Sequence, residues 1–221
     1  MVKDKFEHTP LKDMNIFGPS KTIIDRYLYT VGGLIGKKVL DFGCGSGHGC
    51  ALMRIYGAEE VVGVDNNVIA LKEAKENYNG VISNVSFTNS ITNFPDNYFD
   101  FITSFEVIEH IESKELDKLM IEFKRVCKNN GKMFISTPKT ETGRSSDPNH
   151  INNFTNKTLV TFLEKHFKNN YGVYSTITID EGITQNLVLT NETHDMACSF
   201  ILFITNEKGD KNGKDKHNIN E

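Results

Sequence analysis

The 221-residue sequence contains no tryptophan, only five prolines and only four cysteines. The cysteines form no C-x-x-C pair, which favours small buried thiols over a disulfide framework or a zinc site. No apolar run approaches the roughly 20 residues that a membrane-spanning helix needs. The first 18 residues are rich in charge and lack the apolar segment of a secretory signal. These absences predict a cytoplasmic protein without a membrane span.

Positive charge is also scarce. Lysine and arginine total 25 against 29 acidic residues, the net charge is −4, and the basic residues form no block along the chain. Proteins that bind a phosphate backbone usually present a basic patch or stripe. The charge pattern therefore disfavours nucleic acid as a partner and favours a small molecule, while the oligomeric state stays open.

Short β-branched and aromatic runs alternate with segments of helical periodicity, a pattern typical of βαβ units around a mostly parallel sheet. This alternation predicts an α/β fold. The seven predicted strands cover residues 38–42, 61–64, 85–88, 99–105, 132–137, 173–179 and 199–206. The clearest helix covers residues 114–128 with Ser113 as its expected N-cap, and Thr155 is expected to cap a second one. Further helices are predicted at residues 21–31, from about residue 47, and at 68–78.

The chain divides into three parts by composition. Residues 1–19 are expected to form an N-terminal cap segment, and residues 20–206 a single domain. Residues 207–221 are almost all polar or charged, which predicts a disordered tail. The N-terminal segment is compatible either with a lid over a binding pocket or with a disordered end.

The most informative segment is the run Val-Leu-Asp-Phe-Gly-Cys-Gly-Ser-Gly-His-Gly at residues 39–49, in which a hydrophobic strand runs into a glycine-rich loop. Glycine permits positive φ at a tight strand-to-helix turn and lets a ligand lie against the backbone. The next strand ends at Asp65, 22 positions after Gly43, where a carboxylate can accept both hydroxyls of a ribose. The glycine-rich loop, Asp65 and the spacing between them together predict a nucleoside-binding site.

Two residues narrow the choice of nucleoside. The dinucleotide fingerprint requires glycine or alanine at the position occupied here by His48, so the loop argues against NAD. Asp41 precedes the first loop glycine by two residues, where an acid repels a pyrophosphate but suits a cationic amino-acid group. We therefore expect a ligand that combines adenine, ribose and an ammonium group.

At this point the sequence resembles the class I S-adenosylmethionine-dependent methyltransferases, in particular type 11 and type 23 domains similar to the ubiquinone-pathway O-methyltransferases. Four segments carry the resemblance, and they begin at Val39, Val61, Phe99 and Gly131 and include Phe-Glu-Val-Ile-Glu-His at residues 105–110. The resemblance covers residues 20–206. It implies a Rossmann-like, seven-stranded, mostly parallel sheet with helices on both faces and an antiparallel last strand.

The resemblance also implies a set of donor-binding residues. The loop from Asp41 to Gly47 would hold the methionine part of S-adenosylmethionine, Asp65 the ribose, and Asn66 would border the adenine. The full set is Asp41, Gly43, Cys44, Gly45, Gly47, Asp65, Asn66, Ser90, Ile91, Phe105 and Glu106. The family often has an acid after the third strand, where this chain has Asn89 and Ser90, so we expect weaker selectivity for adenine.

Groups that act on the methyl acceptor should follow the fourth and fifth strands, since α/β sheets bind ligands at the carboxyl ends of their strands. Glu106, Glu109 and His110 follow the fourth strand, and His150 follows the fifth. These four side chains suit a divalent cation, although bracing of the turn is the favoured role for the acids and a metal is possible but not favoured. His150 and His110 are the candidate catalytic residues.

The favoured function is transfer of a methyl group from S-adenosylmethionine to an oxygen or nitrogen of a small metabolite, such as a sugar, a phenol or a lipid-linked precursor. The segment His150-Ile-Asn-Asn-Phe-Thr resembles both methyltransferases of sugar, quinone and lipid pathways and the small-RNA 3′-terminal 2′-O-methyltransferases. Two alternatives therefore stay open: metal-assisted 2′-O-methylation of an RNA 3′ end, and a non-catalytic module that binds S-adenosylmethionine. The sequence leaves the acceptor and the choice between O- and N-methylation undecided.

Overall fold

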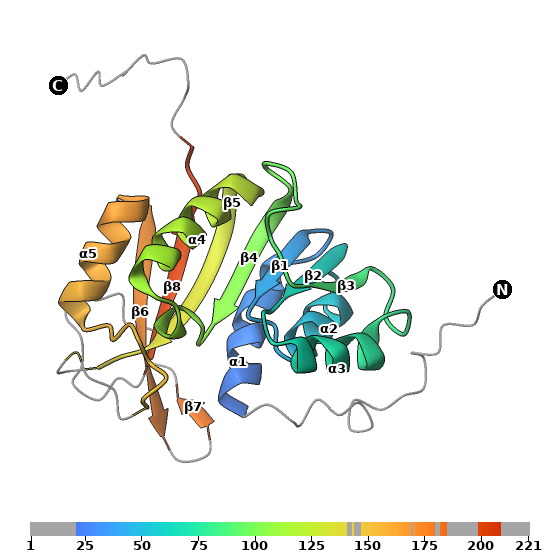
Figure 1. The fold of residues 1–221 in the computed structure, drawn as a ribbon, viewed down its shortest axis with the longest axis horizontal. Helices are drawn as coiled ribbons and strands as arrows, with labels where there is room; N and C mark the ends of the chain where they lie inside the picture. The colour runs from blue at the N-terminus through green and yellow to red at the C-terminus, as the bar shows by residue number, and fades with distance from the viewer. Residues whose placement is uncertain are drawn as a thin grey trace.

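The computed structural model describes residues 21–140, 143, 147–168, 170–179, 182–184 and 199–208. Within these residues the strands form one sheet in the order β3-β2-β1-β4-β5-β8-β6-β7 (Figure 1). The strands are β1 (Lys38–Phe42), β2 (Glu60–Val64), β3 (Val85–Thr88), β4 (Phe99–Phe105), β5 (Cys127–Pro138), β6 (Tyr171–Ile179), β7 (Gly182–Thr184) and β8 (Ser199–Thr205). All seven predicted strands are present, and only the three-residue β7 was not expected.

The direction of the strands confirms the predicted Rossmann-like topology. The strands from β3 to β5 are parallel to one another, whereas β8 lies between β5 and β6 and is antiparallel to both. The central strands are buried almost continuously, as expected for parallel strands that are covered on both faces. The last described strand, β8, is thus antiparallel as predicted, and the short β7 is also antiparallel to its neighbour β6.

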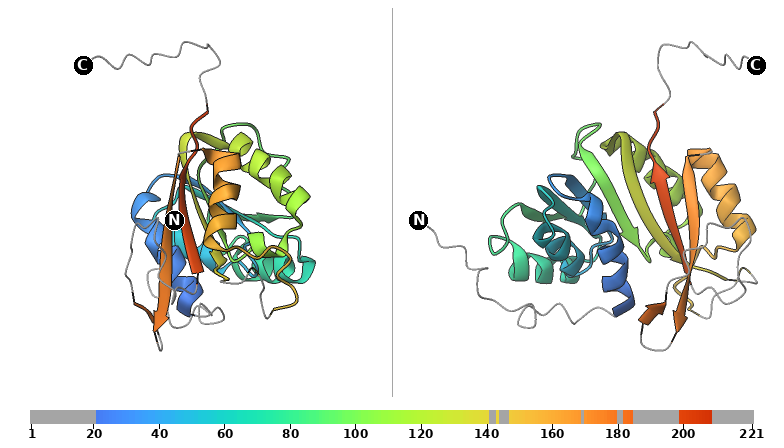
Figure 2. Two further views of the ribbon diagram at one scale, coloured as in Figure 1. Left: turned by 90° about the vertical axis from the view of Figure 1, so that its left-hand side faces the viewer. Right: turned by 180° about the vertical axis from the view of Figure 1, so that it is seen from behind.

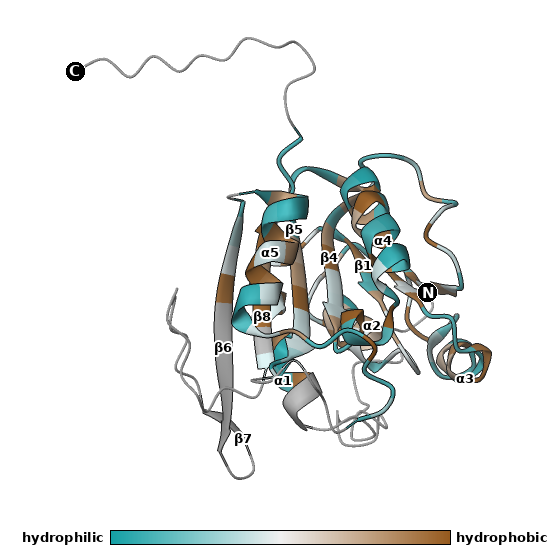
Figure 3. Cartoon of the chain, turned by 60° about the vertical axis from the view of Figure 1, so that its left-hand side comes forward, coloured by the Kyte–Doolittle hydropathy of each residue, from teal (hydrophilic) through white to brown (hydrophobic). Residues whose placement is uncertain are grey.

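Helices cover both faces of this sheet, as the rotated views in Figure 2 show. The helices are α1 (Lys21–Thr30), α2 (His48–Ile55), α3 (Val68–Tyr78), α4 (Ser113–Val126) and α5 (Asn156–Phe167), with short 3-10 turns at η3 (Val31–Gly33) and η4 (Ile108–His110). One hydrophobic core contains the buried side chains of α4 and α5, and the other contains those of α1, α2 and α3. The brown of hydrophobic residues gathers in the central strands, while much of the α4 ribbon has the teal of hydrophilic residues (Figure 3).

One predicted helix boundary is confirmed and one is wrong. Thr155 caps α5 with a reciprocal pair of hydrogen bonds to Thr158. Ser113 is instead the first residue of α4, and its hydroxyl donates to the side chain of Asn152 at 2.8 Å. The helix also ends at Val126, two residues early. Its end is fixed from a distant part of the chain, because the side-chain amide of Asn206 donates to three carbonyls at the junction of α4 and β5.

The order of the strands reverses between β1 and β4, which are neighbours in the sheet although the chain leaves β1 for β2 on the other side. Open α/β sheets bind ligands at such a switch point, outside the carboxyl ends of the strands. The glycine-rich loop after β1 and the turn η4 after β4 lie at this edge.

Three sequence predictions fall partly or wholly outside the described residues. The structure does not describe the N-terminal cap segment 1–19 or the tail beyond residue 208. It also does not describe Cys198, one of the four cysteines predicted to be small buried thiols. The division of the chain into these parts therefore stays a prediction. Within the described ranges, no helix has both the length and the apolar character required to cross a bilayer.

Candidate functional site: a donor cleft and an acid-histidine cluster

The loop between β1 and α2 is folded tightly against the end of β2. The N–H groups of Gly43 and Cys44 both donate to the carbonyl of Val64, at 2.7 and 3.1 Å. Gly43 and Gly47 have φ of +80° and +86°, in the region that favours glycine. A Cβ at Gly43 would lie 2.2 Å from the side chain of Val107, so the loop and the turn after β4 are in direct contact.

Asp65 closes this loop from the neighbouring strand. One carboxylate oxygen accepts a hydrogen bond from the N–H of Gly45 at 2.7 Å, and the other accepts from the N–H of Asn67 at 2.8 Å. A carboxylate offers about four acceptor positions, so each oxygen keeps one for a further donor. Asp65 is half-buried and Asn66 is exposed beside it. The structure thus brings together the loop and the acid that the sequence analysis paired.

Asp41 lies beneath the loop rather than at its surface. Its side chain is fully buried and accepts hydrogen bonds from the hydroxyls of Tyr27 and Thr103, at 3.0 and 2.8 Å, and from the thiol of Cys50 at 3.3 Å. Burial raises the pKa of Asp41 to about 6, although these three hydrogen bonds oppose the shift. The carboxylate is thus already bonded by three protein donors, and its contact with an ammonium group of the ligand stays a prediction.

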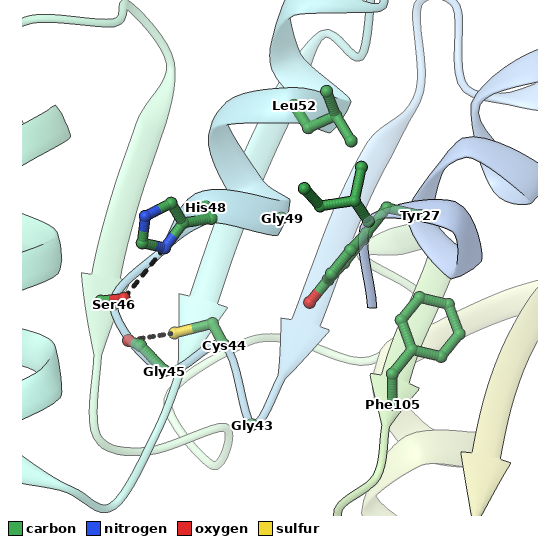
Figure 4. Close-up of a pocket in the computed structure, with 10 residues that line it drawn as sticks. Tyr27, Gly43, Cys44, Gly45, Ser46, His48, Gly49, Leu52 and Phe105 are labelled. Carbon is green, nitrogen blue, oxygen red and sulfur yellow. Dashed lines mark hydrogen bonds between the residues drawn. The ribbon is translucent and has the colours of Figure 1, made fainter. Parts of the chain in front are cut away.

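A cavity of about 170 Å³ opens beside the loop (Figure 4). Its wall combines the loop with the first turn of α2, with α1 and with the end of β4. It is lined by Ile24, Tyr27, Gly43, Cys44, Gly45, Ser46, His48, Gly49, Leu52 and Phe105. The ring of Tyr27 meets the ring of Phe105 edge-on, with 4.9 Å between their centroids. A Cβ at Gly49 would lie 2.0 Å from the Tyr27 ring, so this glycine makes room for the tyrosine.

Ser90 and Ile91, which follow β3, are not among the residues that line this cavity. Ile91 is buried in the core on the α4 and α5 side of the sheet. The hydroxyl of Ser90 is hydrogen bonded to that of Thr92 at 2.8 Å. Cys44 is buried in the cavity wall, and its thiol lies 3.7 Å from the carbonyl of Gly45. These positions leave contacts of Ser90 and Ile91 with adenine as predictions.

Glu106 is positioned at the end of β4 by two residues, Arg26 and Ser136. Its carboxylate lies 3.3 Å from the guanidinium of Arg26 and accepts a hydrogen bond from the hydroxyl of Ser136 at 2.7 Å. Its φ of +56° is unusual for a residue other than glycine. The guanidinium of Arg26 also donates to the hydroxyl of Ser199 at 3.1 Å. The carboxylate of Glu106 is therefore already engaged by protein groups.

Glu109, His110 and His150 form a separate cluster. One ligand-type atom of each residue lies within 4.8 Å of those of the other two. The two imidazole rings meet edge-on with 4.9 Å between centroids, and His150 lies 3.6 Å from the carboxylate of Asp147. Burial, followed by the nearby charge of Glu106, raises the pKa of Glu109 to about 7. Three of the four predicted acceptor-side residues are thus brought together, and Glu106 points to Arg26 instead.

Several residues of the site carry no local sequence signal. Tyr27 and Arg26 lie on a helix that precedes β1, while Thr103 and Ser136 lie inside strands. Their roles arise because the fold brings them against Asp41 and Glu106.

Comparison with known proteins is consistent with this geometry. Residues 40–135 match a protein-family profile described as a methyltransferase domain. Phosphoethanolamine N-methyltransferase 1 of Arabidopsis thaliana is 36% identical over 119 residues, which cover 51% of this chain and 24% of that protein. A ubiquinone biosynthesis O-methyltransferase of Glaesserella parasuis is 34% identical over 113 residues, which cover 48% of this chain and 47% of that protein. The matches span less than half the length of these relatives.

Solved structures show the same fold. A SAM dependent methyltransferase from Archaeoglobus fulgidus has a TM-score of 0.64 and 20% identity, over 88% of this chain and 98% of that chain. A SAM dependent methyltransferase from Aquifex aeolicus has a TM-score of 0.61 and 18% identity, over 90% and 99% of the two chains. At these identities the likeness concerns the fold alone. The matched segment, which spans less than half of this chain, is similar to a methyltransferase domain, and the fold is that of the solved SAM dependent methyltransferases.

Proposed function

We propose that the protein transfers the methyl group of S-adenosylmethionine to an oxygen or nitrogen atom of a small metabolite. The observation that carries this proposal is the hydrogen bond between Gly45 and Asp65, which joins the glycine-rich loop to the acid after β2. Each oxygen of Asp65 keeps an acceptor position, so the carboxylate can receive two ribose hydroxyls while it still holds the loop. The same group thus shapes the cleft and binds the donor.

The methionine end of the donor would lie in the cavity between α1 and the loop. Gly43 and Gly45 expose backbone there, and Phe105 and Tyr27 supply an apolar wall. An apolar wall beside polar backbone suits a sulfonium on a short alkyl chain, because pockets for small molecules combine apolar lining with a few fixed polar groups. Tyr27 would turn its hydroxyl from Asp41 toward the donor when the ammonium group enters.

Methyl transfer from a sulfonium is an in-line displacement, so the protein mainly has to hold the acceptor atom at attack distance. The end of β4 connects the cavity proposed for the donor with the residues proposed for the acceptor. Phe105 borders the cavity, and Glu109 and His110 follow four and five residues later. We assign His110 and His150 to the acceptor end, where an imidazole can take the proton of an attacking hydroxyl or amine.

The acidic character of this end favours a small acceptor over an RNA 3′ end. Glu106, Glu109 and Asp147 lie at or next to the histidine pair, and carboxylates repel a phosphate backbone. Sugars, phenols and lipid-linked precursors fit the proposal. The two relatives named above act on nitrogen and on oxygen respectively, according to their names, and both atoms stay within it.

The direct test is formation of a labelled product. The purified protein is incubated with S-adenosylmethionine that carries a trideuterated methyl group, together with a small-metabolite extract or, separately, with small RNA. We expect a deuterated small-molecule product from the wild-type protein and at least about 100-fold less from Asp65→Ala, since two hydrogen bonds to a charged group are lost. Labelled RNA, no labelled product, or equal product from Asp65→Ala would contradict the proposal.

A further inference from the structure

Two thiols point to one place beneath the glycine-rich loop. Cys44 lies in the loop and Cys50 in the first turn of α2, and both are buried free thiols. A Cβ on Gly63, in the neighbouring strand β2, would lie 2.8 Å from the sulfur of Cys44 and 2.9 Å from that of Cys50. Both sulfur atoms therefore border the space that Gly63 leaves by lacking a side chain. The proposed function uses neither thiol group.

The two thiols differ in access. Cys44 is 6% exposed and lines the cavity beside the loop, so a small molecule in this cavity meets its sulfur (Figure 4). Cys50 is fully buried, and its thiol donates to the carboxylate of Asp41 at 3.3 Å. Burial, followed by the neighbouring thiol of Cys44, raises the pKa of the Cys50 thiol well above its usual value, so this thiol keeps its proton. Cys44 is thus the thiol that an oxidant reaches first.

The backbone around Cys44 allows its sulfur to approach Cys50. Cys44 stands between Gly43 and Gly45, and nothing lies within 4 Å of the would-be Cβ of Gly45. Cys50 is held in α2 and by its bond to Asp41. A disulfide keeps its sulfur atoms about 2.05 Å apart, so the movement that closes such a bond falls on the loop.

We propose that Cys44 and Cys50 are a reversible oxidation site, which takes a peroxide as its oxidant and closes a disulfide beneath the donor loop. First, the sulfur of Cys44 attacks the O–O bond of hydrogen peroxide and becomes a sulfenic acid, while the thiol proton and the displaced hydroxide leave as water. Next, the sulfur of Cys50 displaces hydroxide from the sulfenic sulfur. The proton of Cys50 passes through the carboxylate of Asp41 to this hydroxide, which leaves as a second water. Two thiols are oxidised to one disulfide, and one peroxide is reduced to two waters.

The disulfide would regulate the binding of the donor, and for this part alone the inference rests on the proposed function. The N–H of Gly43 donates to the carbonyl of Val64, and that of Gly45 donates to Asp65. Because Cys44 lies between these two glycines, drawing its sulfur toward Cys50 pulls on both hydrogen bonds. The loop then no longer matches the carboxylate that receives the ribose. Oxidation therefore weakens donor binding, and by reciprocity the bound donor opposes the disulfide.

Peptide mapping of the wild-type protein tests the oxidation site without any donor. Trypsin releases residues 39–54 as one peptide that contains both cysteines, because Lys38 precedes it and Arg54 ends it. After treatment of the folded protein with hydrogen peroxide, we expect this peptide to be lighter by two hydrogen atoms. Dithiothreitol should restore its mass. An unchanged peptide, or a peptide that only gains oxygen atoms at its cysteines, would overturn the inference.

Two variants assign the steps to the two thiols. In Cys50→Ala, peroxide should leave a sulfenic acid on Cys44 that dimedone traps, whereas the wild type gives little adduct because Cys50 consumes the sulfenic acid. Cys127→Ala removes a buried thiol outside the site and should form the disulfide as the wild type does. A disulfide from Cys44 to Cys127 or to Cys198, in place of the one to Cys50, would contradict the proposed pair.

Calorimetric titration with S-adenosylmethionine tests the regulatory part on reduced and oxidised wild-type protein. We expect oxidation to weaken binding at least about tenfold, within the usual range of coupling between two sites, and dithiothreitol to restore it. Cys44→Ala should have one affinity before and after peroxide. Equal affinity of the reduced and oxidised wild type would overturn the regulation. A disulfide without donor binding by the reduced protein would contradict the proposed function alone, and donor binding without a disulfide would remove the oxidation site alone.

Discussion

Gly43 occupies a conformation and a space that suit no other residue type. It has φ of +80°, and an added Cβ would lie 2.2 Å from the side chain of Val107. Gly45 also has positive φ, +52°, but nothing lies within 4 Å of its would-be Cβ. The two glycines of one loop therefore differ in what they contribute. Gly45 needs its backbone conformation, whereas Gly43 also needs the absence of a side chain where the loop meets the turn after β4.

This difference predicts the ranking of two alanine variants. Gly43→Ala should lower the free energy of unfolding by about 3 kcal/mol, from the strained φ together with overpacking. Gly45→Ala should lower it by about 1 kcal/mol, from φ alone. Urea unfolding of both variants, and of Gly43→Ala combined with Val107→Ala, provides the measurement. The double variant should recover part of the loss, and equal losses for the two single variants would show that the contact with Val107 is unimportant.

Asp41 makes stability depend on pH in a defined direction. Its pKa is raised from 3.8 to about 6 in the folded protein, so the folded chain keeps a proton that the unfolded chain has lost. The contribution of Asp41 to the free energy of unfolding therefore falls by roughly 3 kcal/mol as pH rises from about 4 to about 6, and stays level above that.

Asp41→Asn lacks this titration. As pH rises from about 4 to about 6, the free energy of unfolding of the wild type should fall relative to that of Asp41→Asn, because the other acids contribute equally to both proteins. Urea unfolding at several pH values measures the difference, and a difference that does not change with pH would rule out the raised pKa.

Among single residues, the sequence predicted those whose role follows from a local pattern. Gly43, Gly45 and Asp65 lie at fixed offsets around a strand-to-helix turn, and in the structure the N–H of Gly45 donates to Asp65 while that of Gly43 donates to the carbonyl of Val64. Tyr27 and Arg26 could not be found in this way, because their partners are contributed by strands that pack against α1 only in the folded chain.

Helix α1 is anchored to the site by two consecutive residues. Tyr27 bonds the acid at the end of β1, and Arg26 pairs with Glu106 at the end of β4. The helix thus connects the glycine-rich loop with the acceptor end. Its predicted bounds were close to those observed, since an apolar helical stripe is a local signal, but its function depends on these long-range contacts.

For the ion pair of Arg26 and Glu106 we predict that the two single substitutions lower stability by unequal amounts and that their effects are coupled. The side chain of Arg26 is 5% exposed and that of Glu106 is 24% exposed. Glu106→Gln should therefore destabilise the protein more than Arg26→Met, because it leaves a buried cation unpaired while the remaining carboxylate in Arg26→Met can be hydrated. We expect a coupling energy of about 1–3 kcal/mol from urea unfolding of both single variants and the double variant. Strictly additive effects would mean that the pair does not anchor α1.

Other elements show where local patterns fail. Strand β7 has three residues and, within the described part of the chain, pairs only with β6, so no periodicity could reveal it. The end of α4 is set by Asn206 at the far end of the domain, which explains why the predicted helix was two residues too long. Thr155, by contrast, caps α5 through Thr158 three residues later, and such a short-range motif can be read from sequence.

The architecture as a whole follows from a few general rules. Alternating strands and helices with short connections favour a parallel sheet with right-handed crossovers, which puts helices on both faces. The position of β8 between β5 and β6 does not follow from those rules, and the family resemblance led us to expect only that the last strand is antiparallel. The reversal of strand order between β1 and β4 then explains why the cavity beside the glycine-rich loop and the acid-histidine cluster lie at one edge of the sheet.

The central claim is that the glycine-rich loop and Asp65 together bind S-adenosylmethionine. Calorimetric titration of the purified protein with this compound tests it most directly, with Asp65→Ala as the variant and Asp96→Ala, an exposed acid paired with Arg125, as the matched control. The account predicts micromolar or tighter binding by the wild type and by Asp96→Ala, and binding about 100-fold weaker by Asp65→Ala. Absence of binding by the wild type, or equal affinity in Asp65→Ala, would contradict it.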